Sequence, residues 1–383
     1  MVNNNSSRRT FLAGISKAAG AITLGPMAGA WAAVHKDEEF HEAQPPGIES
    51  LKDLAARKGI LYGAATEHGK LSGDAAFAAL IAEQCDLLVP EGELKWNTLR
   101  PTPDSFNFGP SDELYAFTQQ HQMKYRGHTL VWHEALPKWF AGYATKANAQ
   151  SLLTEHISKV VGHYAGKMQS WDVINEALLP EDHRSDGLRN SPWLELLGPG
   201  YIETALRAAA QADPSAMLVW NETWIEEDTS LAESKRQSFL QHLRDLQQRN
   251  VPLHGIGIQS HLMGDHKNIG GANFQRFLHE VSEMNLKILI TEMDIRDFKL
   301  PAETAERDRI VGDKYSQYLS SVLQHKSVIA VLTWGLSDRY TWIAKANPRS
   351  DGAAVRPLPF DENLAPTPAF YAIAKAFEET PRR

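Results

Sequence analysis

The 383-residue sequence is poor in three features: cysteine, long apolar runs and excess positive charge. Cys85 is the one cysteine, so no disulfide can form within the chain and stability must come from a hydrophobic core. Beyond the N-terminal region, no run reaches the roughly 18 apolar residues that a membrane-spanning helix needs. A formal net charge of −8 lacks the basic excess that phosphate binding requires, which argues against a nucleic acid partner. We therefore expect a soluble globular protein.

The first 32 residues have the pattern of an export signal. Paired arginines, Arg8 and Arg9, precede an apolar run that continues to about Leu24, and small residues follow at Ala28-Gly29-Ala30. The arginine pair resembles a bacterial twin-arginine signal, so we expect the protein to be exported, either periplasmic or secreted. A basic amphipathic helix is the alternative, but Gly14, Gly20 and Gly25 disfavour it. The expected division is a signal peptide at 1–32, an N-terminal segment at 33–49 and a catalytic domain at 50–383.

Short β-rich runs alternate with helical segments along the rest of the chain. The eight runs begin at Gly59, Leu87, Tyr125, Gln169, Met217, Gly255, Leu286 and Val328. Continuous apolar strands separated by amphipathic helices indicate a parallel sheet buried on both faces, and eight such units are the number that closes a (β/α)₈ barrel. We expect an α/β fold with one such TIM barrel, in which Cys85 packs as a small apolar residue. A doubly wound open sheet is the alternative, but its G-x-G-x-x-G signature is missing.

Polar side chains close nearly every predicted strand. The active site of a (β/α)₈ barrel lies at the carboxyl ends of its strands, so these residues have priority as functional candidates. Trp171 and Trp220 lie nearer the starts or middles of strands, and we expect them to pack in the core. The strand-end candidates are Glu91, Glu93, Lys95, His128, Trp132, His133, Asn175, Glu176, Asn221, Glu222, Gln259, His261, Glu292, Asp294 and Trp334.

Glu176 and Glu292 stand out because each follows a strongly apolar strand. Facing carboxylates without a metal cluster are what glycoside hydrolysis needs, with one group protonated as an acid and the other ionised. Metal-dependent hydrolysis is the main alternative, but the His-Glu pairs that begin at His133 and His279 both lack the second histidine of H-E-x-x-H. Serine hydrolysis is disfavoured because no G-x-S-x-G is present. We expect no metal and no cofactor.

Six fragments in order give the chain a family resemblance. They are GHTLVWHEALP, WDVINEA, GIGIQSHL, ITEMDI, WGLSDRYTW and PTPAFYAIAKAF. With these the sequence resembles glycoside hydrolase family 10, the retaining endo-β-1,4-xylanases. The resemblance covers nearly all of residues 50–377. It implies cleavage of internal bonds in β-1,4-linked xylan or its oligosaccharides, and we expect the enzyme to act as a monomer.

The resemblance also assigns roles residue by residue. It makes Glu176 the general acid/base and Glu292 the nucleophile, with their carboxyl groups roughly 5–5.5 Å apart as in retaining enzymes. His261 would bond Glu292 and be oriented by Asp294. The remaining assignments are Asn175 on the sugar 2-hydroxyl, Gln259 near the acid/base, Glu91, Lys95, His128 and Trp132 on the non-reducing side, and Trp334 and Trp342 covering the site.

Three departures from the family pattern concern substrate binding. Gly92 replaces an asparagine in EGELKW, Glu134-Ala135 replaces serine-glutamine after LVWH, and NETW stands where N-D-Y is common. Lost hydrogen bonds would weaken binding of plain xylan by about 1 kcal/mol or more each. Two alternatives therefore stay open: the same chemistry on another or a decorated β-glycan, and a carbohydrate-binding protein without catalysis.

Overall fold

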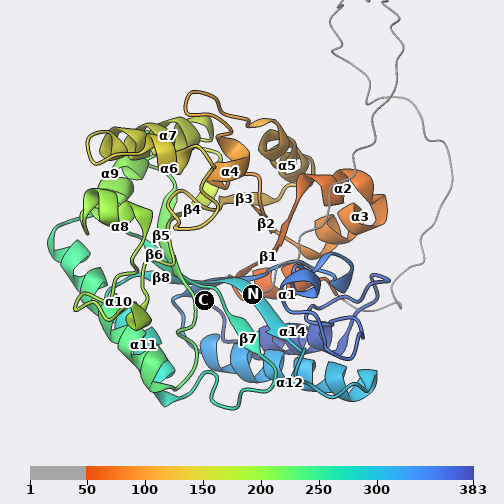
Figure 1. Ribbon diagram of the computed structural model, residues 1–383. Helices are drawn as coiled ribbons and strands as arrows, with labels where there is room; N and C mark the ends of the chain where they lie inside the picture. Colours follow the sequence, from red (N-terminus) through yellow and green to blue (C-terminus); the bar gives the residue numbers. More distant parts are fainter. Residues whose placement is uncertain (1–48) are drawn as a thin grey trace, which may run out of the picture. The chain divides into compact units, whose positions relative to one another are not determined.

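The computed structural model describes residues 49–383, so the predicted signal at 1–32 and nearly all of the segment at 33–49 lie outside the described residues. The strands are all parallel, in the order β6-β5-β4-β3-β2-β1-β9-β8, and β6 also pairs with β8. That last pairing closes the sheet into an eight-stranded barrel surrounded by helices (Figure 1). The predicted (β/α)₈ fold is confirmed.

The strands coincide with the eight predicted β-rich runs. Their bounds are β1 Leu61–Thr66, β2 Leu87–Pro90, β3 Lys124–Gly127, β4 Met168–Asn175, β5 Met217–Glu222, β6 Gly255–Ile258, β8 Lys287–Arg296 and β9 Val328–Thr333. A three-residue strand, β7 at His261–Met263, extends the sixth run and pairs with the end of β8. It places His261 opposite Asp294.

Helices follow the strands and cover the outside of the barrel (Figure 1). The longer helices are α3 Ala75–Gln84, α5 Gly109–Gln120, α7 Ala149–His163, α9 Tyr201–Ala212, α10 Ser230–Gln248, α11 Ala272–Glu283, α12 Thr304–Val322 and α14 Pro368–Glu379. The shorter ones are α1 Leu51–Ala56, α2 His68–Gly73, α4 Trp96–Leu99, α6 Phe140–Tyr143, α8 Pro192–Leu197 and α13 Ile343–Ala346, with 3₁₀ turns at Pro180–Asp182 and Asp338–Tyr340. No helix among the described residues is long and apolar enough to cross a membrane.

The strands are apolar on both faces because one face meets the barrel interior and the other meets the helices. Leu87, Val89 and Leu289 belong to the interior cluster. Trp171 and Trp220 are fully buried in the layer between strands and helices, which confirms that they are core residues. Gly127 leaves the space that the Trp171 ring fills, since a Cβ there would collide with the ring.

Two smaller predictions are also confirmed. Cys85 is fully buried, and burial raises the pKa of its thiol, so it packs as an apolar residue. The C-terminal pattern forms α14, which packs against α12 and α1 in the outer layer. The side chain of Thr367 caps its first turn by accepting from the backbone N–H of Ala369.

Candidate active site

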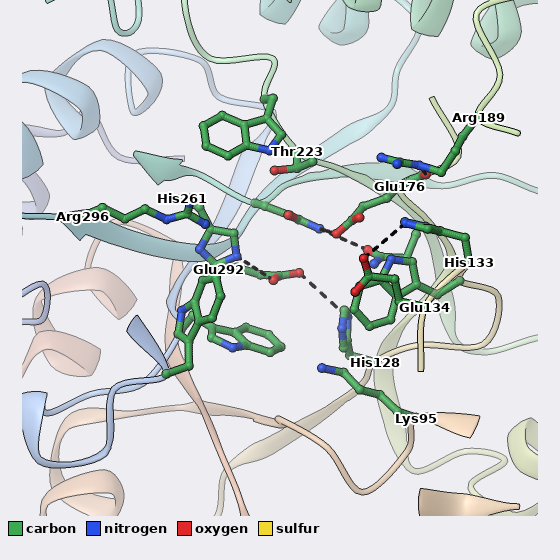
Figure 2. Close-up of a pocket in the computed structure, with 16 residues that line it drawn as sticks. Lys95, His128, His133, Glu134, Glu176, Arg189, Thr223, His261, Glu292 and Arg296 are labelled. Atoms are coloured by element: carbon green, nitrogen blue, oxygen red, sulfur yellow. Dashed lines mark hydrogen bonds and ion pairs between the residues drawn. The ribbon is translucent and has the colours of Figure 1, made fainter. Parts of the chain in front are cut away.

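A cavity of about 400 Å³ opens at the carboxyl ends of the strands and brings most of the predicted site residues together (Figure 2). Glu176 and Glu292 both line it: Glu176 directly follows β4, and Glu292 lies within β8, before the strand ends at Arg296. Its other lining residues are Lys95, His128, Trp132, His133, Glu134, Asn175, Arg189, Thr223, Trp224, Gln259, His261, Arg296, Trp334 and Trp342.

Glu292 is buried and held by hydrogen bonds on both carboxyl oxygens. His261 Nε2 lies 3.1 Å from Oε2, and Asn221 Nδ2 donates to Oε1 at 2.7 Å. Burial acts to raise its pKa, but the hydrogen bond from His261, the fields of His128 and His261, and the bond from Asn221 together lower that pKa to about 2. Glu292 is therefore a carboxylate at any pH near neutrality.

His261 is in turn held by Asp294, whose Oδ2 lies 3.0 Å from Nδ1 of the imidazole. Burial acts to lower the pKa of His261, but the charge and hydrogen bond of Asp294 and the bond to Glu292 raise it to about 10. The imidazole is thus protonated at neutral pH and donates to both acids. The indole Nε1 of Trp342 also donates to Asp294, at 2.8 Å, which fixes that indole against the site.

A chain of side-chain amides connects Glu176 with Glu292. Gln259 Nε2 donates to Glu176 Oε1 at 2.9 Å and lies 3.4 Å from Asn175 Oδ1. Asn221 Nδ2 donates to the same Asn175 oxygen at 2.8 Å as well as to Glu292. The Nδ2 of Asn175 is buried without a hydrogen bond partner, so it is a donor left for a bound molecule. We call Gln259, Asn175 and Asn221 the amide chain.

The backbone around Glu176 is unusual and firmly held. Glu176 has a φ of 53°, in the left-handed region that few residues other than glycine adopt. Its N–H donates to the carbonyl of Asn221 at 2.9 Å, and its own carbonyl accepts from Arg189 Nε at 2.8 Å. Such conformations persist where surrounding bonds enforce them, and they cluster at functional sites.

Glu222 ends β5 but points away from the cavity into a buried ion pair. Its Oε2 lies 2.8 Å from Lys235 Nζ, and both side chains are almost fully buried. Its Oε1 accepts from the indole of Trp220 and from the backbone N–H of Leu178, two residues after Glu176. The strand-end candidate Glu222 therefore does not enter the cavity, and it holds the chain segment that carries Glu176 through the bond to Leu178.

Lys95, Trp132 and Trp334 form one wall of the cavity. Lys95 Nζ lies 5.1 Å from the ring centre of Trp132 and 5.6 Å from that of Trp334. Glu91, which was expected beside them, does not line this cavity and forms an ion pair with Lys70. Asp294 also lies behind the cavity wall, where it contacts His261 and Trp342.

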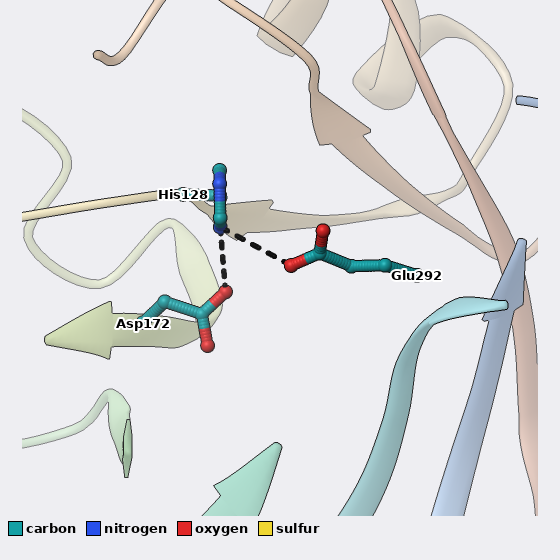
Figure 3. A group of neighbouring side chains, drawn as sticks. All are labelled: His128, Asp172 and Glu292. Carbon is teal, nitrogen blue, oxygen red and sulfur yellow. Dashed lines mark hydrogen bonds and ion pairs between the residues drawn. The ribbon is translucent and has the colours of Figure 1, made fainter. Parts of the chain in front are cut away.

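His128, Asp172 and Glu292 place three possible metal-ligand atoms close together (Figure 3). The Asp172 oxygens, however, bind Arg126 and His128, and Glu292 Oε1 already accepts from Asn221. A divalent cation there would lie beside the permanent positive charge of Arg126 and would displace these bonds. The residues therefore do not suit a metal, and the His128 ring, 3.9 Å from Glu292, contributes to the polar surroundings of that carboxylate.

Comparison with protein families gives a match over most of the chain. The model of glycosyl hydrolase family 10 matches residues 50–376. The chain belongs to this family. It is a glycoside hydrolase, and its position in family 10 agrees with paired acids at the mouth of a closed (β/α)₈ barrel.

Individual relatives of this family 10 chain are similar along nearly their whole length. The β-1,4-xylanase of Dictyoglomus thermophilum is 35% identical over 347 residues, which cover 87% of this chain and 93% of the relative. The crystal structure of xylanase 10B from Thermotoga maritima has a TM-score of 0.78 at 33% identity and covers 86% of this chain and 98% of that one. Xylanase 10B from Thermotoga petrophila, solved in complex with xylobiose, has a TM-score of 0.77 at 33% identity, with coverage of 87% and 98%.

Several cavity residues of this family 10 chain were not assigned by the sequence analysis. Thr223 and Trp224 directly follow the last residue of β5, and Arg296 is the last residue of β8, so a wider window at strand ends would have included them. Glu134, and Thr223 and Trp224 within NETW, were noted only as departures from the family pattern. No strand-end signal marks Arg189, which comes from the loop after β4.

His133 was noted as a strand-end residue but given no role. Its ring lines the cavity near Glu134, 3.6 Å from that carboxylate. Burial, and then the charge of Arg189, lower the pKa of His133 to about 4. His133 is therefore neutral near neutral pH, unlike His261 on the far side of Glu292.

Proposed function

We propose that this protein is a retaining endo-β-1,4-xylanase in which Glu176 is the general acid/base and Glu292 the nucleophile. The observation that carries the proposal is the contrast between the surroundings of Glu176 and those of Glu292. Glu292 is buried, doubly hydrogen-bonded and ionised, whereas Glu176 receives one amide hydrogen bond and lies at the cavity surface. Two carboxyl groups held in such different surroundings suit the two roles of a retaining glycosidase.

In the first step Glu292 attacks the anomeric carbon while Glu176 gives its proton to the leaving oxygen. The glycosidic bond breaks, the reducing-side sugar leaves as an alcohol, and a glycosyl ester forms on Glu292. In the second step Glu176, now a carboxylate, takes a proton from water, whose oxygen displaces Glu292. Two inversions give net retention. The expected carboxyl separation of roughly 5–5.5 Å stays a prediction.

The amide chain and the cavity wall offer hydrogen bond donors to the hydroxyl groups of the sugar. The unpartnered Nδ2 of Asn175 is available to the sugar 2-hydroxyl, where a bond strengthens as positive charge develops on the ring. Lys95 and His128 supply donors for hydroxyl groups on the non-reducing side, and Trp334 and Trp342 offer ring faces for sugar C–H patches. Xylobiose, bound by the Thermotoga petrophila relative, is a suitable probe ligand.

The test follows the stereochemistry of the products and distinguishes the role of Glu176 from that of Glu292. We expect xylohexaose to yield β-anomers first, as followed by NMR. Glu292→Ala should lose activity, and added azide should give an α-glycosyl azide because the anion occupies the vacated nucleophile position. Glu176→Ala should still cleave an aryl xylobioside with a good leaving group, and azide should give a β-glycosyl azide. Initial α-anomers, or activity that survives in Glu292→Ala, would contradict the proposal.

A decorated or different β-glycan is the second candidate substrate, and the space at Gly92 favours it. A Cβ added at Gly92 would meet only Glu67 Oε1, at 3.7 Å, so the position where the family has an asparagine is open. A substrate panel of linear xylo-oligosaccharides, decorated xylans and cello-oligosaccharides tests this. Cleavage of xylohexaose at a rate similar to the best decorated substrate would exclude a redefined specificity.

We further propose that residues 1–32 direct export and that the mature enzyme is a monomer. The Arg8-Arg9 pair and the apolar run after it support the first part. The closed ring of strands in one barrel, which holds both Glu176 and Glu292 in one cavity, supports the second, because the site then needs no residue from a second copy. Cell fractionation of the wild type and of an Arg8→Lys/Arg9→Lys variant tests export, with retention in the cytoplasm expected for the variant. Light scattering after size exclusion tests the monomer.

A further inference from the structure

Arg296 is a cation in the cavity wall without a protein counter-ion. It ends β8 and lines the cavity, and its Nε is buried without a hydrogen bond partner. Within residues 49–383, no carboxylate forms an ion pair with it. Buried or half-buried charged donors are normally paired, so an unpaired guanidinium in a cavity indicates a partner that comes with the ligand.

Two indoles hold the guanidinium in place. Its central carbon lies 5.1 Å from the ring centre of Trp224 and 5.2 Å from that of Trp342. The bond from Trp342 Nε1 to Asp294 fixes the second ring. Cation–π contacts of this kind engage the positive charge and do not use the N–H groups as hydrogen bond donors. The donors stay available in the fork geometry that matches a carboxylate.

Trp224 has a conformation that its own packing does not explain. Its φ is 56°, in the left-handed region, which is costly for a bulky side chain, and 46% of its surface is exposed. It contributes little to the core in return. A strained, exposed indole on the rim of a sugar-binding cavity indicates a contact with the ligand.

The position of Arg296 relative to Glu292 indicates which part of the substrate it meets. Figure 2 shows Arg296 and Lys95 on opposite sides of Glu292. Lys95 belongs to the proposed non-reducing side, so Arg296 faces the leaving-group side. The other cavity cations are differently engaged, since Arg189 donates to the backbone of Glu176 and Lys95 lies near the rings of Trp132 and Trp334.

We propose that Arg296, in contact with the rings of Trp224 and Trp342, binds the carboxylate of a uronic acid substituent on a leaving-group-side sugar of the glycan. This inference rests on the proposed function and deepens it, because it names an acidic, decorated xylan as the preferred substrate. A neutral substituent, such as arabinose, would leave the guanidinium unpaired. On the other side of the cavity, Glu134 would repel an acidic group.

The test compares two substrates that differ only in charge. One is a xylo-oligosaccharide with a single glucuronate substituent, and the other is the same compound with the carboxyl group reduced to an alcohol. We expect the wild type to have a kcat/KM about tenfold higher on the acidic compound, as one charge-assisted hydrogen bond provides, and the ratio should fall with added salt. Arg296→Gln should bring the ratio close to one, and Arg296→Lys should give an intermediate value.

Arg309→Gln is the matched control, since Arg309 is an exposed arginine on α12 and its ratio should equal that of the wild type. A wild-type ratio near one would overturn the proposal, as would a high ratio that persists in Arg296→Gln. Mass spectrometry must place the acid on the reducing-side product, and placement only on the other product would equally overturn it.

Undecorated xylohexaose separates this proposal from the proposed function. If no substrate is cleaved, the proposed function fails, and calorimetric titration of both test compounds then measures the affinity ratio directly. Tighter binding of the acidic compound than of the reduced compound by the wild type, but not by Arg296→Gln, would still support the role of Arg296. Equal affinities would overturn it.

Discussion

At the scale of single residues, Asn221 connects the site through three side-chain hydrogen bonds. Its Nδ2 donates to Asn175 and Glu292, and its Oδ1 accepts from the hydroxyl of Thr291 at 2.7 Å. The neighbouring strand leaves room for it at Gly257, where a Cβ would collide with the Asn221 amide. The glycine therefore shapes the hydrogen bonds on Glu292, although it does not line the cavity.

Gly257→Ala should lower kcat by about 100-fold, because a displaced Asn221 releases both Glu292 and Asn175 and misplacement of about 1 Å is enough for such a loss. Steady-state kinetics on xylohexaose measure it. Gly162→Ala is the control: Gly162 lies in α7 with no atom within 4 Å of an added Cβ, so kcat should not change. An unchanged kcat in Gly257→Ala would show that the Asn221 contacts are dispensable.

His261→Asn should move the acidic limb of the profile of kcat/KM against pH toward higher pH. The wild-type limb should follow the Glu292 pKa of about 2, and without the imidazolium the effect of burial raises that pKa above its usual range. Activity is lost as pH falls through this pKa, since Glu292 must be ionised to act as the proposed nucleophile. Profiles from about pH 3 to about pH 7 measure the shift, with exposed His279→Asn as the control. Coincident profiles for both variants would refute this coupling.

At the scale of elements, α10 supports the loop that carries Glu176. Lys235 on α10 reaches Glu222 at the end of β5, and Glu222 accepts the N–H of Leu178. Buried ion pairs add little stability when intact, but removal of one partner leaves the other charge buried and unpaired. The pair thus makes the position of the loop that carries the proposed acid/base depend on a helix outside the ring of strands.

Lys235→Met should destabilise the fold by about 3–5 kcal/mol, because the Glu222 carboxylate stays buried without its counter-ion. The double variant Glu222→Gln/Lys235→Met should recover part of that loss. Arg309→Ala, which breaks an exposed pair with Asp313, should cost less than about 1 kcal/mol. Urea unfolding gives the three values. A loss in Lys235→Met no larger than in the surface control would mean that this pair does not support the fold.

The elements were predictable from the sequence, whereas side-chain directions beyond the strand ends were not. Each β-rich run became a strand because it is buried on both faces, which leaves a continuous apolar signature. At the end of β5, however, the neighbours Asn221 and Glu222 point to opposite faces, and the sequence alone does not tell which one enters the cavity. Past the strand the alternation ends altogether, which is why Arg189 was missed and Trp224 was noted only as part of a departure from the family pattern.

At the scale of the whole molecule, the paired charges in the site predict a pH optimum for stability. The pKa of Glu292 is lowered from 4.5 to about 2, so its contribution is complete above 4.5 and is lost as pH falls toward 2. The pKa of His261 is raised from 6.5 to about 10, so its contribution is complete below 6.5 and is lost as pH rises toward 10. Both contributions are present together between 4.5 and 6.5.

The destabilisation caused by His261→Asn should therefore be greatest near about pH 5.5 and shrink toward about pH 9.5. Urea midpoints of the wild type and the variant, measured across this range, give the difference at each pH. His279→Asn should show a small difference that does not vary in this way. A constant difference for His261→Asn would mean that the histidine acts through packing alone.

The pairing of the first barrel strand with the last has a consequence for synthesis. β1 pairs with β9, so the barrel cannot close until Val328–Thr333 have left the ribosome. Glu176 is translated long before this point and Glu292 shortly before it, yet the cavity that holds them needs the finished ring of strands. A nascent chain therefore stays inactive until near its end. On a route that carries folded proteins, as proposed here for export, each molecule would leave the cytoplasm with an assembled active site.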